Sequence, residues 1–163
     1  MAIPAEGINK VSGVLHSINV SAGGVPKLAR RSAAVRFGGV DGDRQRDLRY
    51  HGGPTRAVSL YALELIRALQ GEGNPIDVGC IGENFTLAGV PWDRMVPGVT
   101  LEVGAVQLEL TSYAAPCNNL MPYFAGGKFV RVAQKVHPGW SRLYARVLRE
   151  GSVQVGDPVS FEP

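Results

Sequence analysis

Glycine and proline are spread along the whole chain, and this distribution constrains the possible folds more than any other feature of the sequence. The 163 residues include 21 glycines and 11 prolines, with no run of them that could serve as a linker. Such spacing requires many tight turns between short elements, which favours β architecture over a helical bundle. The length suits one domain with a hydrophobic core and is too short for two, so we expect a single domain over residues 1–163.

Alternating apolar and polar residues indicate where the strands lie. We expect strands over residues 11–21, 33–37, 57–62 and 84–90, a hairpin over 99–113 that turns at Gly104, and two or three strands within 141–163. Directly after residue 62, Leu63, Ile66 and Leu69 have helical spacing, and Gly71 is the expected stop. About eight strands and one helix result. The predicted fold is therefore mainly β, with a closed or nearly closed barrel that hides the strand edges and one or a few short helices.

Charge and hydropathy exclude several broad classes of protein. The formal net charge of +3 is too low for a general nucleic-acid binder, although converging arginines would suit a small anionic ligand. The longest apolar runs are far shorter than a membrane span, and the N-terminal MAIPAEGINK lacks the pattern of a secretion signal. The chain is not rich in disulfide-forming cysteines, so we expect a reduced, cytoplasmic protein without membrane or nucleic-acid partners.

Four short segments combine glycine with polar side chains in a way that a plain core does not require: GGVDGD (38–43), RYHGGPTRAV (49–58), GCIGENF (79–85) and APCNN (115–119). By itself the first segment, which contains Asp43, is typical of an ordinary Asp/Gly turn. In the second, Gly52 and Gly53 let the backbone approach a ligand next to His51, and Arg56 could bind a phosphate. A loop histidine that caps a turn is the alternative.

The third and fourth segments offer polar groups at the ends of strands. Glu83 and Asn84 only satisfy loop backbone in the simpler interpretation, but a planar ligand rich in N–H and C=O groups would need such partners. Cys117 follows Pro116 just past a strand, where its thiol can face a cleft as a metal ligand, a nucleophile or a sulfur carrier. A buried, inert cysteine is the alternative, and Cys80, between Gly and Ile without polar neighbours, fits it.

Taken together and in order, these segments resemble the MOSC domain family, named for the C-terminal domain of molybdenum cofactor sulfurase. The matching series is INVSAGGVPK, GGVDGD, HGGPTRAVSLY, GENFTLAGV, PGVTLEVGAVQLELT, APC and YARVLREGSVQVGDPV, and it covers most of the chain. The small stand-alone bacterial members are the most similar. The resemblance implies a MOSC-type β-barrel with a cleft for the molybdenum cofactor (Mo-molybdopterin), a pterin that carries a dithiolene and a phosphate.

The resemblance also assigns roles to individual residues. In cofactor-bound relatives the cysteine of the PC motif ligates molybdenum, and this cysteine corresponds to Cys117. His51 would line the cleft with support from Asp43, Asn118 would hydrogen-bond an oxo group or the substrate, and Arg56 would bind the cofactor phosphate. The expected catalytic residues are thus Cys117, His51 and Asn118, with Cys117 as the metal ligand, and the expected cofactor-binding residues are Arg56, Gly52, Gly53, Glu83, Asn84, Asp43 and Arg142.

One stretch departs from the family pattern. Many members have a glycine-bracketed segment with an internal arginine before the late YxRV strand. Here the sequence is HPGWSRLYARV (137–147), with Arg142 where a glycine is expected and Trp140 near the usual arginine position. Either the phosphate clamp is rebuilt, with His137 and Arg142 as the residues to inspect, or the chain belongs to a subgroup that binds a different ligand.

Three functions remain open on these grounds. The first is a molybdenum-dependent enzyme that reduces N-hydroxylated compounds, and the second is a non-catalytic carrier that holds a persulfide or the cofactor on Cys117. The third is a family member that keeps the barrel but has lost the ligand. The sequence contains no Fe–S cysteine set and no dinucleotide fingerprint. The enzyme hypothesis therefore requires an external reductase, and the carrier hypothesis a sulfur donor protein.

Overall fold

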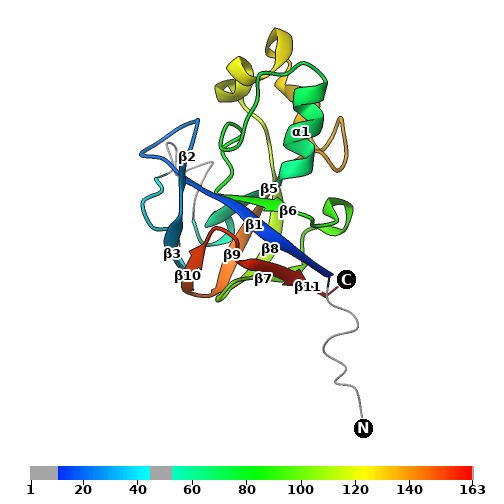
Figure 1. Ribbon diagram of the computed structural model, residues 1–163. Helices are drawn as coiled ribbons and strands as arrows, with labels where there is room; N and C mark the ends of the chain where they lie inside the picture. Colours follow the sequence, from blue (N-terminus) through cyan, green and yellow to red (C-terminus); the bar gives the residue numbers. More distant parts are fainter. Residues whose placement is uncertain (1–10, 45–52, 163) are drawn as a thin grey trace.

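The computed structural model describes residues 11–44 and 53–162, which form a closed seven-stranded β-barrel with small additions (Figure 1). The strands of the barrel are β1 (Val11–Val20), β5 (Val58–Ala62), β6 (Phe85–Ala88), β7 (Thr100–Val103), β8 (Val106–Ala114), β9 (Arg142–Arg149) and β11 (Pro158–Phe161). They follow one another in the order β11–β7–β8–β9–β5–β6–β1, and antiparallel pairing of β1 with β11 closes the ring. β5 and β6 run parallel, whereas the other neighbours in the barrel are antiparallel.

A smaller antiparallel sheet packs beside the barrel. It consists of β10 (Gly151–Gln154), β3 (Ser32–Arg36) and β4 (Gly39–Val40), and the short β2 (Leu28–Arg30) pairs with the C-terminal half of β1. Val35, Val40 and Val153 of the small sheet belong to the same buried cluster as the barrel interior. The two sheets therefore share one hydrophobic core.

The barrel strands show how the sequence pattern produces this core. Along β8, Val106, Leu108 and Leu110 are buried while the residues between them are partly exposed, as period-two alternation requires. β5 differs because all five of its residues are buried. Its Leu60 packs inside the barrel, whereas Tyr61 points to the other face, where it joins a second apolar cluster.

This second cluster covers one end of the barrel. Its helices are α1 (Leu63–Gly71) and the 3₁₀ helices η4 (Asn118–Tyr123), η5 (Ala125–Gly127) and η6 (Phe129–Val132). Figure 1 shows α1 (green) and these short helices (yellow) together at one end of the molecule. Ile66 and Leu69 on the buried face of α1 cluster with Leu120, Phe124 and Val132. Two further 3₁₀ turns are η2 (Pro54–Arg56) and η3 (Trp92–Arg94), and no helix in the described ranges is long and apolar enough to cross a membrane.

The sequence-based prediction of a mainly β barrel with few helices is confirmed. Each expected strand is present within a residue or two of its predicted bounds, and the hairpin turns at Gly104. The described residues contain two strands more than the segments identified in the sequence, β2 and β4, which are three and two residues long. Segments this short cannot display an alternating pattern. The 3₁₀ helices between residues 118 and 132 were also missed, because their sequence, which includes an internal Pro122, has no helical period.

Gly79 provides a test of the packing between the loop before β6 and the chain before β2. Its φ of 85° is unfavourable for other residues, and a Cβ atom there would collide with the carbonyl oxygen of Lys27. Gly79→Ala should therefore lower the free energy of unfolding by about 3 kcal/mol or more in urea titrations. Gly73→Ala is the matched control, because Gly73 has a similar φ of 94° but open space around it. Equal losses in the two variants would contradict the close approach of Gly79 to Lys27.

Candidate functional site

Cys117 lies just beyond the end of β8. The last residue of β8, Ala114, pairs with Arg142, the first residue of β9. Cys117 follows three residues later, within about 10 Å of extended chain. It has an extended backbone (φ −136°, ψ 176°), its carbonyl accepts a hydrogen bond from the N–H of Leu120 at 3.0 Å, and its side chain is partly exposed. Cys117 thus follows the end of a strand, as the sequence indicated, and its expected place in a cofactor cleft stays a prediction.

Two guanidinium groups meet at the ring of Tyr144. Arg142 and Arg56 lie 5.3 and 5.4 Å from the ring centroid, respectively. Nη1 of Arg142 also donates a hydrogen bond of 2.9 Å to the carbonyl oxygen of Gly82. Gly82 has a φ of 90°, and a Cβ atom there would lie 3.0 Å from this Nη1. A residue without a side chain is therefore needed here for the guanidinium to fit. Arginines anchored on an aromatic ring present planar donors that suit a phosphate or carboxylate.

The side-chain amide of Asn84 joins three segments beneath these arginines. It is fully buried, and its Oδ1 accepts a hydrogen bond of 3.0 Å from the N–H of Ser59. Its Nδ2 donates to the carbonyl oxygen of Asn19 at 3.2 Å and to Oδ2 of Asp43 at 2.9 Å. Asn84 therefore orders the loop in which it lies, as one of the two sequence-based interpretations expected.

Asp43 forms a buried ion pair that the sequence analysis did not anticipate. Nζ of Lys27 lies 2.6 Å from Oδ1 of Asp43, and each side chain is only 5% exposed. The same oxygen accepts a hydrogen bond from the N–H of Ser21 at 3.0 Å. Burial lowers the pKa of Lys27, and the hydrogen bond and charge of Asp43 oppose that effect. The one signal in the sequence was the position of Lys27 in the family segment INVSAGGVPK. The expected support of His51 by Asp43 stays a prediction, because His51 lies outside the described residues.

Glu83 is a fully buried carboxyl group with an incomplete set of partners. Its Oε2 accepts a hydrogen bond of 3.0 Å from the hydroxyl of Thr86, whereas Oε1 makes no hydrogen bond of normal geometry to any residue that the structure describes. Burial raises the pKa of Glu83 to about 7. The N–H groups of Glu83 and Gly79, the Thr86 hydroxyl and the charge of Arg142 oppose this effect. A group of this kind changes its charge near neutral pH.

The remaining predicted residues occupy different positions. Asn118 is exposed at the start of η4, and Gly53 precedes η2 with a φ of 83° and its carbonyl bonded to the N–H of Arg56 at 3.0 Å. Cys80 is buried in the second apolar cluster, and burial raises the pKa of its thiol. His51 and Gly52 lie outside the described residues, so their roles stay predictions.

The residues of the stretch that departs from the family pattern (137–147) make contacts in two separate parts of the structure. Arg142 belongs to the group around Tyr144, whereas the ring of Trp140 is covered by the guanidinium of Arg131 at 3.9 Å. Arg131 in turn binds both carboxylate oxygens of Glu72 at 2.9 and 2.8 Å. The hydrogen bond from Arg131 and its charge lower the pKa of Glu72, and His137 adds a smaller effect in the same direction. Of the two residues singled out for a rebuilt clamp, Arg142 thus contacts the same ring as Arg56, whereas His137 influences Glu72 at the end of α1.

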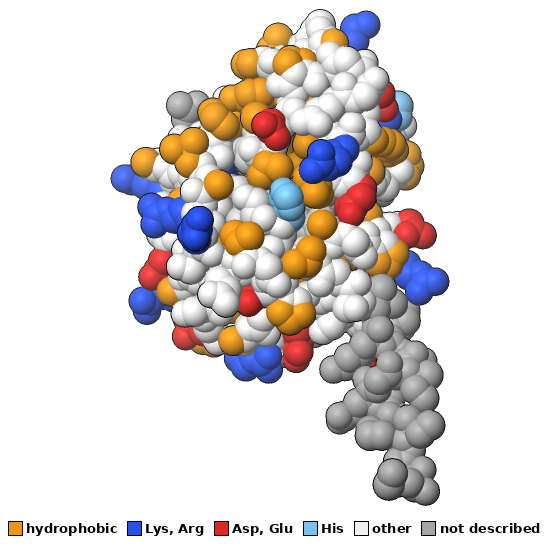
Figure 2. All heavy atoms as spheres, in the orientation of Figure 1, with side chains coloured by type: hydrophobic (Ala, Val, Ile, Leu, Met, Phe, Trp, Pro, Cys, Tyr) orange, Lys and Arg blue, Asp and Glu red, His pale blue; other side chains and the backbone are white. Residues whose placement is uncertain are grey.

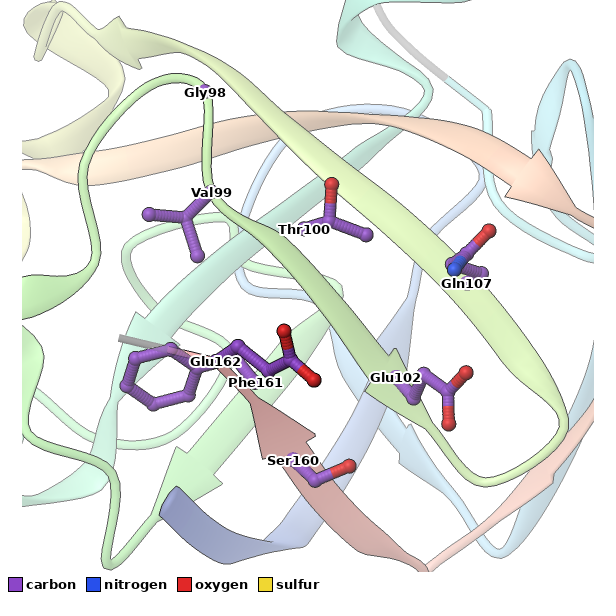
Figure 3. A pocket seen from close by; sticks show the side chains of 8 residues that line it. All are labelled: Gly98, Val99, Thr100, Glu102, Gln107, Ser160, Phe161 and Glu162. Carbon is purple, nitrogen blue, oxygen red and sulfur yellow. The ribbon is translucent and has the colours of Figure 1, made fainter. Parts of the chain in front are cut away.

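Other features of the described surface do not coincide with this site. Figure 3 shows a pocket of about 440 Å³ between β7, β8 and β11, with Glu102, Gln107 and Ser160 among its side chains. None of the predicted site residues that the structure describes lines it. Over residues 11–44 and 53–162, no three His, Cys, Asp or Glu side chains form a group that could hold a metal ion.

The raised pKa of Glu83 predicts a pH-dependent stability. In the unfolded chain this carboxyl titrates near 4.5, so below that pH it is neutral in both states and burial carries no charge penalty. Stability should fall as the pH rises from 4.5 through about 7, by about 3 kcal/mol in total. Glu83→Gln removes this titration. The free energy of unfolding of the variant, relative to that of the parent, should therefore be higher at pH 8 than at pH 5. Urea unfolding at both pH values measures the difference, with exposed Glu162→Gln as the control. If the difference between variant and parent were the same at pH 5 and pH 8, the pKa of Glu83 would not be raised in the folded protein.

Comparisons with known proteins concern the family and the fold of the chain. The MOSC domain family matches residues 47–160. The uncharacterized protein YflK from Bacillus subtilis (strain 168) is 30% identical over 135 residues, which are 82% of this chain and 60% of the length of that relative. The YUAD protein from Bacillus subtilis has the same fold with a TM-score of 0.75 and 17% identity, over 94% of this chain and 98% of that one. YiiM from Geobacillus stearothermophilus has a TM-score of 0.70 and 24% identity, over 93% of this chain and 75% of that one.

The family match includes β5 to β10 and most of β11, the loop with Glu83 and Asn84, and Cys117. The two solved structures support the fold alone. Because the family match extends over more than half of the sequence, the chain belongs to the MOSC domain family.

Proposed function

We propose that this protein binds the molybdenum cofactor beside Cys117 and acts as the catalytic subunit of a system that reduces N-hydroxylated compounds. The observation that carries the proposal is the partly exposed thiol of Cys117 after β8. It lies next to the strand whose first residue, Arg142, shares the ring of Tyr144 with Arg56. In a MOSC protein, this combination supplies a soft ligand for the metal and cations for the phosphate.

The residues present fit such a cofactor. Apart from Nη1, the N–H groups of Arg142 have no acceptor among the described residues, so they are available to a phosphate. The guanidinium of Arg56 lies against the same ring. Glu83 and Asn84 are fully buried, which favours their role in ordering the loop over a direct contact with the pterin.

In this proposal each residue has a limited task. Cys117 binds the metal as a thiolate, Arg56 and Arg142 hold the phosphate, and the exposed Asn118 hydrogen-bonds the substrate. The bound cofactor supplies the redox centre. Reduction of an N-hydroxylated amine breaks the N–O bond, takes up two electrons and two protons, and releases water. The electrons come from an external reductase.

A carrier function is the second candidate, and the accessibility of the same thiol favours it. The Cys117 thiolate would attack the outer sulfur of a donor persulfide, forming a Cys117 persulfide and releasing the donor as a thiol. The sulfur would then pass to a metal–sulfur cofactor. This function needs a sulfur donor protein and no reductase.

Metal analysis separates the two candidates. Protein purified from a host that makes the cofactor should contain molybdenum and pterin in about equal amounts, and Cys117→Ala should lose most of the molybdenum because its ligand is gone. Cys80→Ala is the matched control and should retain it, since Cys80 packs in an apolar cluster. Mass spectrometry measures the metal and also detects a persulfide on Cys117. A persulfide without metal would support the carrier. If neither molybdenum nor a persulfide is found, and Cys117→Ala has unchanged stability, both functions are contradicted.

The two cysteines should also differ in reactivity. Cys117 is partly exposed, whereas Cys80 is buried with a raised pKa, so iodoacetamide should modify Cys117 at least about tenfold faster in the folded protein. Peptide mass spectrometry over a time course measures both rates. In urea the rates should converge, which is the control. Equal protection of both thiols in the folded protein would contradict an accessible Cys117.

A further inference from the structure

A depression on the outer surface of the barrel collects side chains that can carry positive charge. Its volume is about 540 Å³, within the usual range for small-molecule sites. His16, Arg30 and Arg31 line it together with the apolar Ala29 and Val155, and no carboxylate belongs to the lining. Figure 2 shows Lys and Arg side chains (blue) along the edge of the molecule where β2 and β3 lie in Figure 1.

His16 reaches this surface because of an irregularity in β1. Leu15 pairs with Leu87 and Ser17 pairs with Thr86, so His16 is an extra residue without a partner on β6. Leu15 and Ser17 are both buried, whereas His16 is exposed. Such bulges redirect a side chain while the flanking residues keep their places in the sheet. The bulge therefore turns an imidazole toward the depression at no cost to the core.

The two arginines are held by backbone contacts. Arg31 lies in the bend between β2 and β3, where its carbonyl accepts a hydrogen bond of 2.9 Å from the N–H of Val155. The guanidinium of Arg30 lies over Gly42, where a Cβ atom would come within 3.0 Å of it. These contacts fix the backbone around the depression and leave the side chain of Arg31 exposed.

The positive charge is not compensated within the described residues. Neither Arg30 nor Arg31 forms an ion pair there. The acids of the neighbouring 38–43 loop already bind other cations, since Asp41 pairs with Arg36 and Asp43 with Lys27. An anion that entered the depression would thus meet guanidinium donors without competing carboxylates.

We propose that this depression binds a small molecule that carries a phosphate or a similar doubly charged oxyanion on a compact, partly apolar body. The guanidinium groups of Arg30 and Arg31 and an imidazole N–H of His16 supply the donors for the oxyanion. Ala29 and Val155 supply an apolar wall for the body of the ligand. The site shares no residue with the group formed by Cys117, Arg56 and Arg142, so it stands independently of the proposed function.

An NMR titration tests the proposal with phenyl phosphate and inorganic phosphate as probes. Phenyl phosphate should cause saturable shifts at the backbone amides of residues 16, 29–31 and 154–155, and it should bind more tightly than inorganic phosphate because of the apolar wall. Arg31→Gln and His16→Gln should each weaken binding by about fivefold or more. Both side chains are exposed, so the variants should keep the parent spectrum elsewhere.

Two control variants make the test specific. Arg94→Gln removes an exposed arginine of η3 outside the depression and should leave the affinity unchanged. Arg142→Gln should abolish any phosphate shifts near Tyr144 without altering those at residues 29–31. The proposal fails if the shifts do not saturate, if they occur only around Arg56 and Arg142, or if Arg31→Gln and Arg94→Gln have the same effect.

Discussion

The arrangement of the site depends on one buried amide. Asn84 has no exposed surface, and its side chain binds Ser59 on β5, Asn19 on β1 and Asp43 after β4. These segments are distant in sequence, and further hydrogen bonds between them, such as Asn19 N–H to the carbonyl oxygen of Asn84 and Ser21 N–H to Asp43, reinforce the junction. Because a buried donor or acceptor without a partner costs about 1–3 kcal/mol, each bond constrains the segment at its other end. One side chain thus sets how closely the barrel wall approaches the loop that carries Asp43 and its partner Lys27.

The charged groups around this amide differ in how deeply they are buried. The Lys27–Asp43 pair and Glu83 are buried, while Arg56, Arg142 and Cys117 have partial access to solvent. Removing one partner of a buried pair leaves a charge in a poor environment at a cost of about 3–5 kcal/mol, so the deeper groups act on stability. The outer groups are the ones that a ligand can reach. The hydrogen bond from Arg142 to the carbonyl of Gly82 connects the two levels.

Sequence reasoning succeeded where a local pattern carried the information. The alternation along β8 predicted its strand, and the proline before Cys117 indicated that this cysteine follows the strand end in extended chain. Sequence reasoning missed Lys27, because lysine side chains are usually exposed to solvent. Only the tertiary pairing with Asp43 explains why this one is buried. The choice between ligand contact and loop ordering for Asn84 likewise needed the burial of that side chain. The bulge at His16 was missed because register appears only when β1 meets β6.

The closure of the barrel has a consequence for synthesis. The seam joins Val11 to Phe161, the beginning of β1 to the end of β11. A chain that emerges from the ribosome therefore cannot complete its ring until β11 has been made, and until then β1 and β7 expose unpaired edges. Such long-range pairing is slow, and open edges invite association with other chains. Cellular yield of this protein should thus depend on how quickly its last strand follows its first.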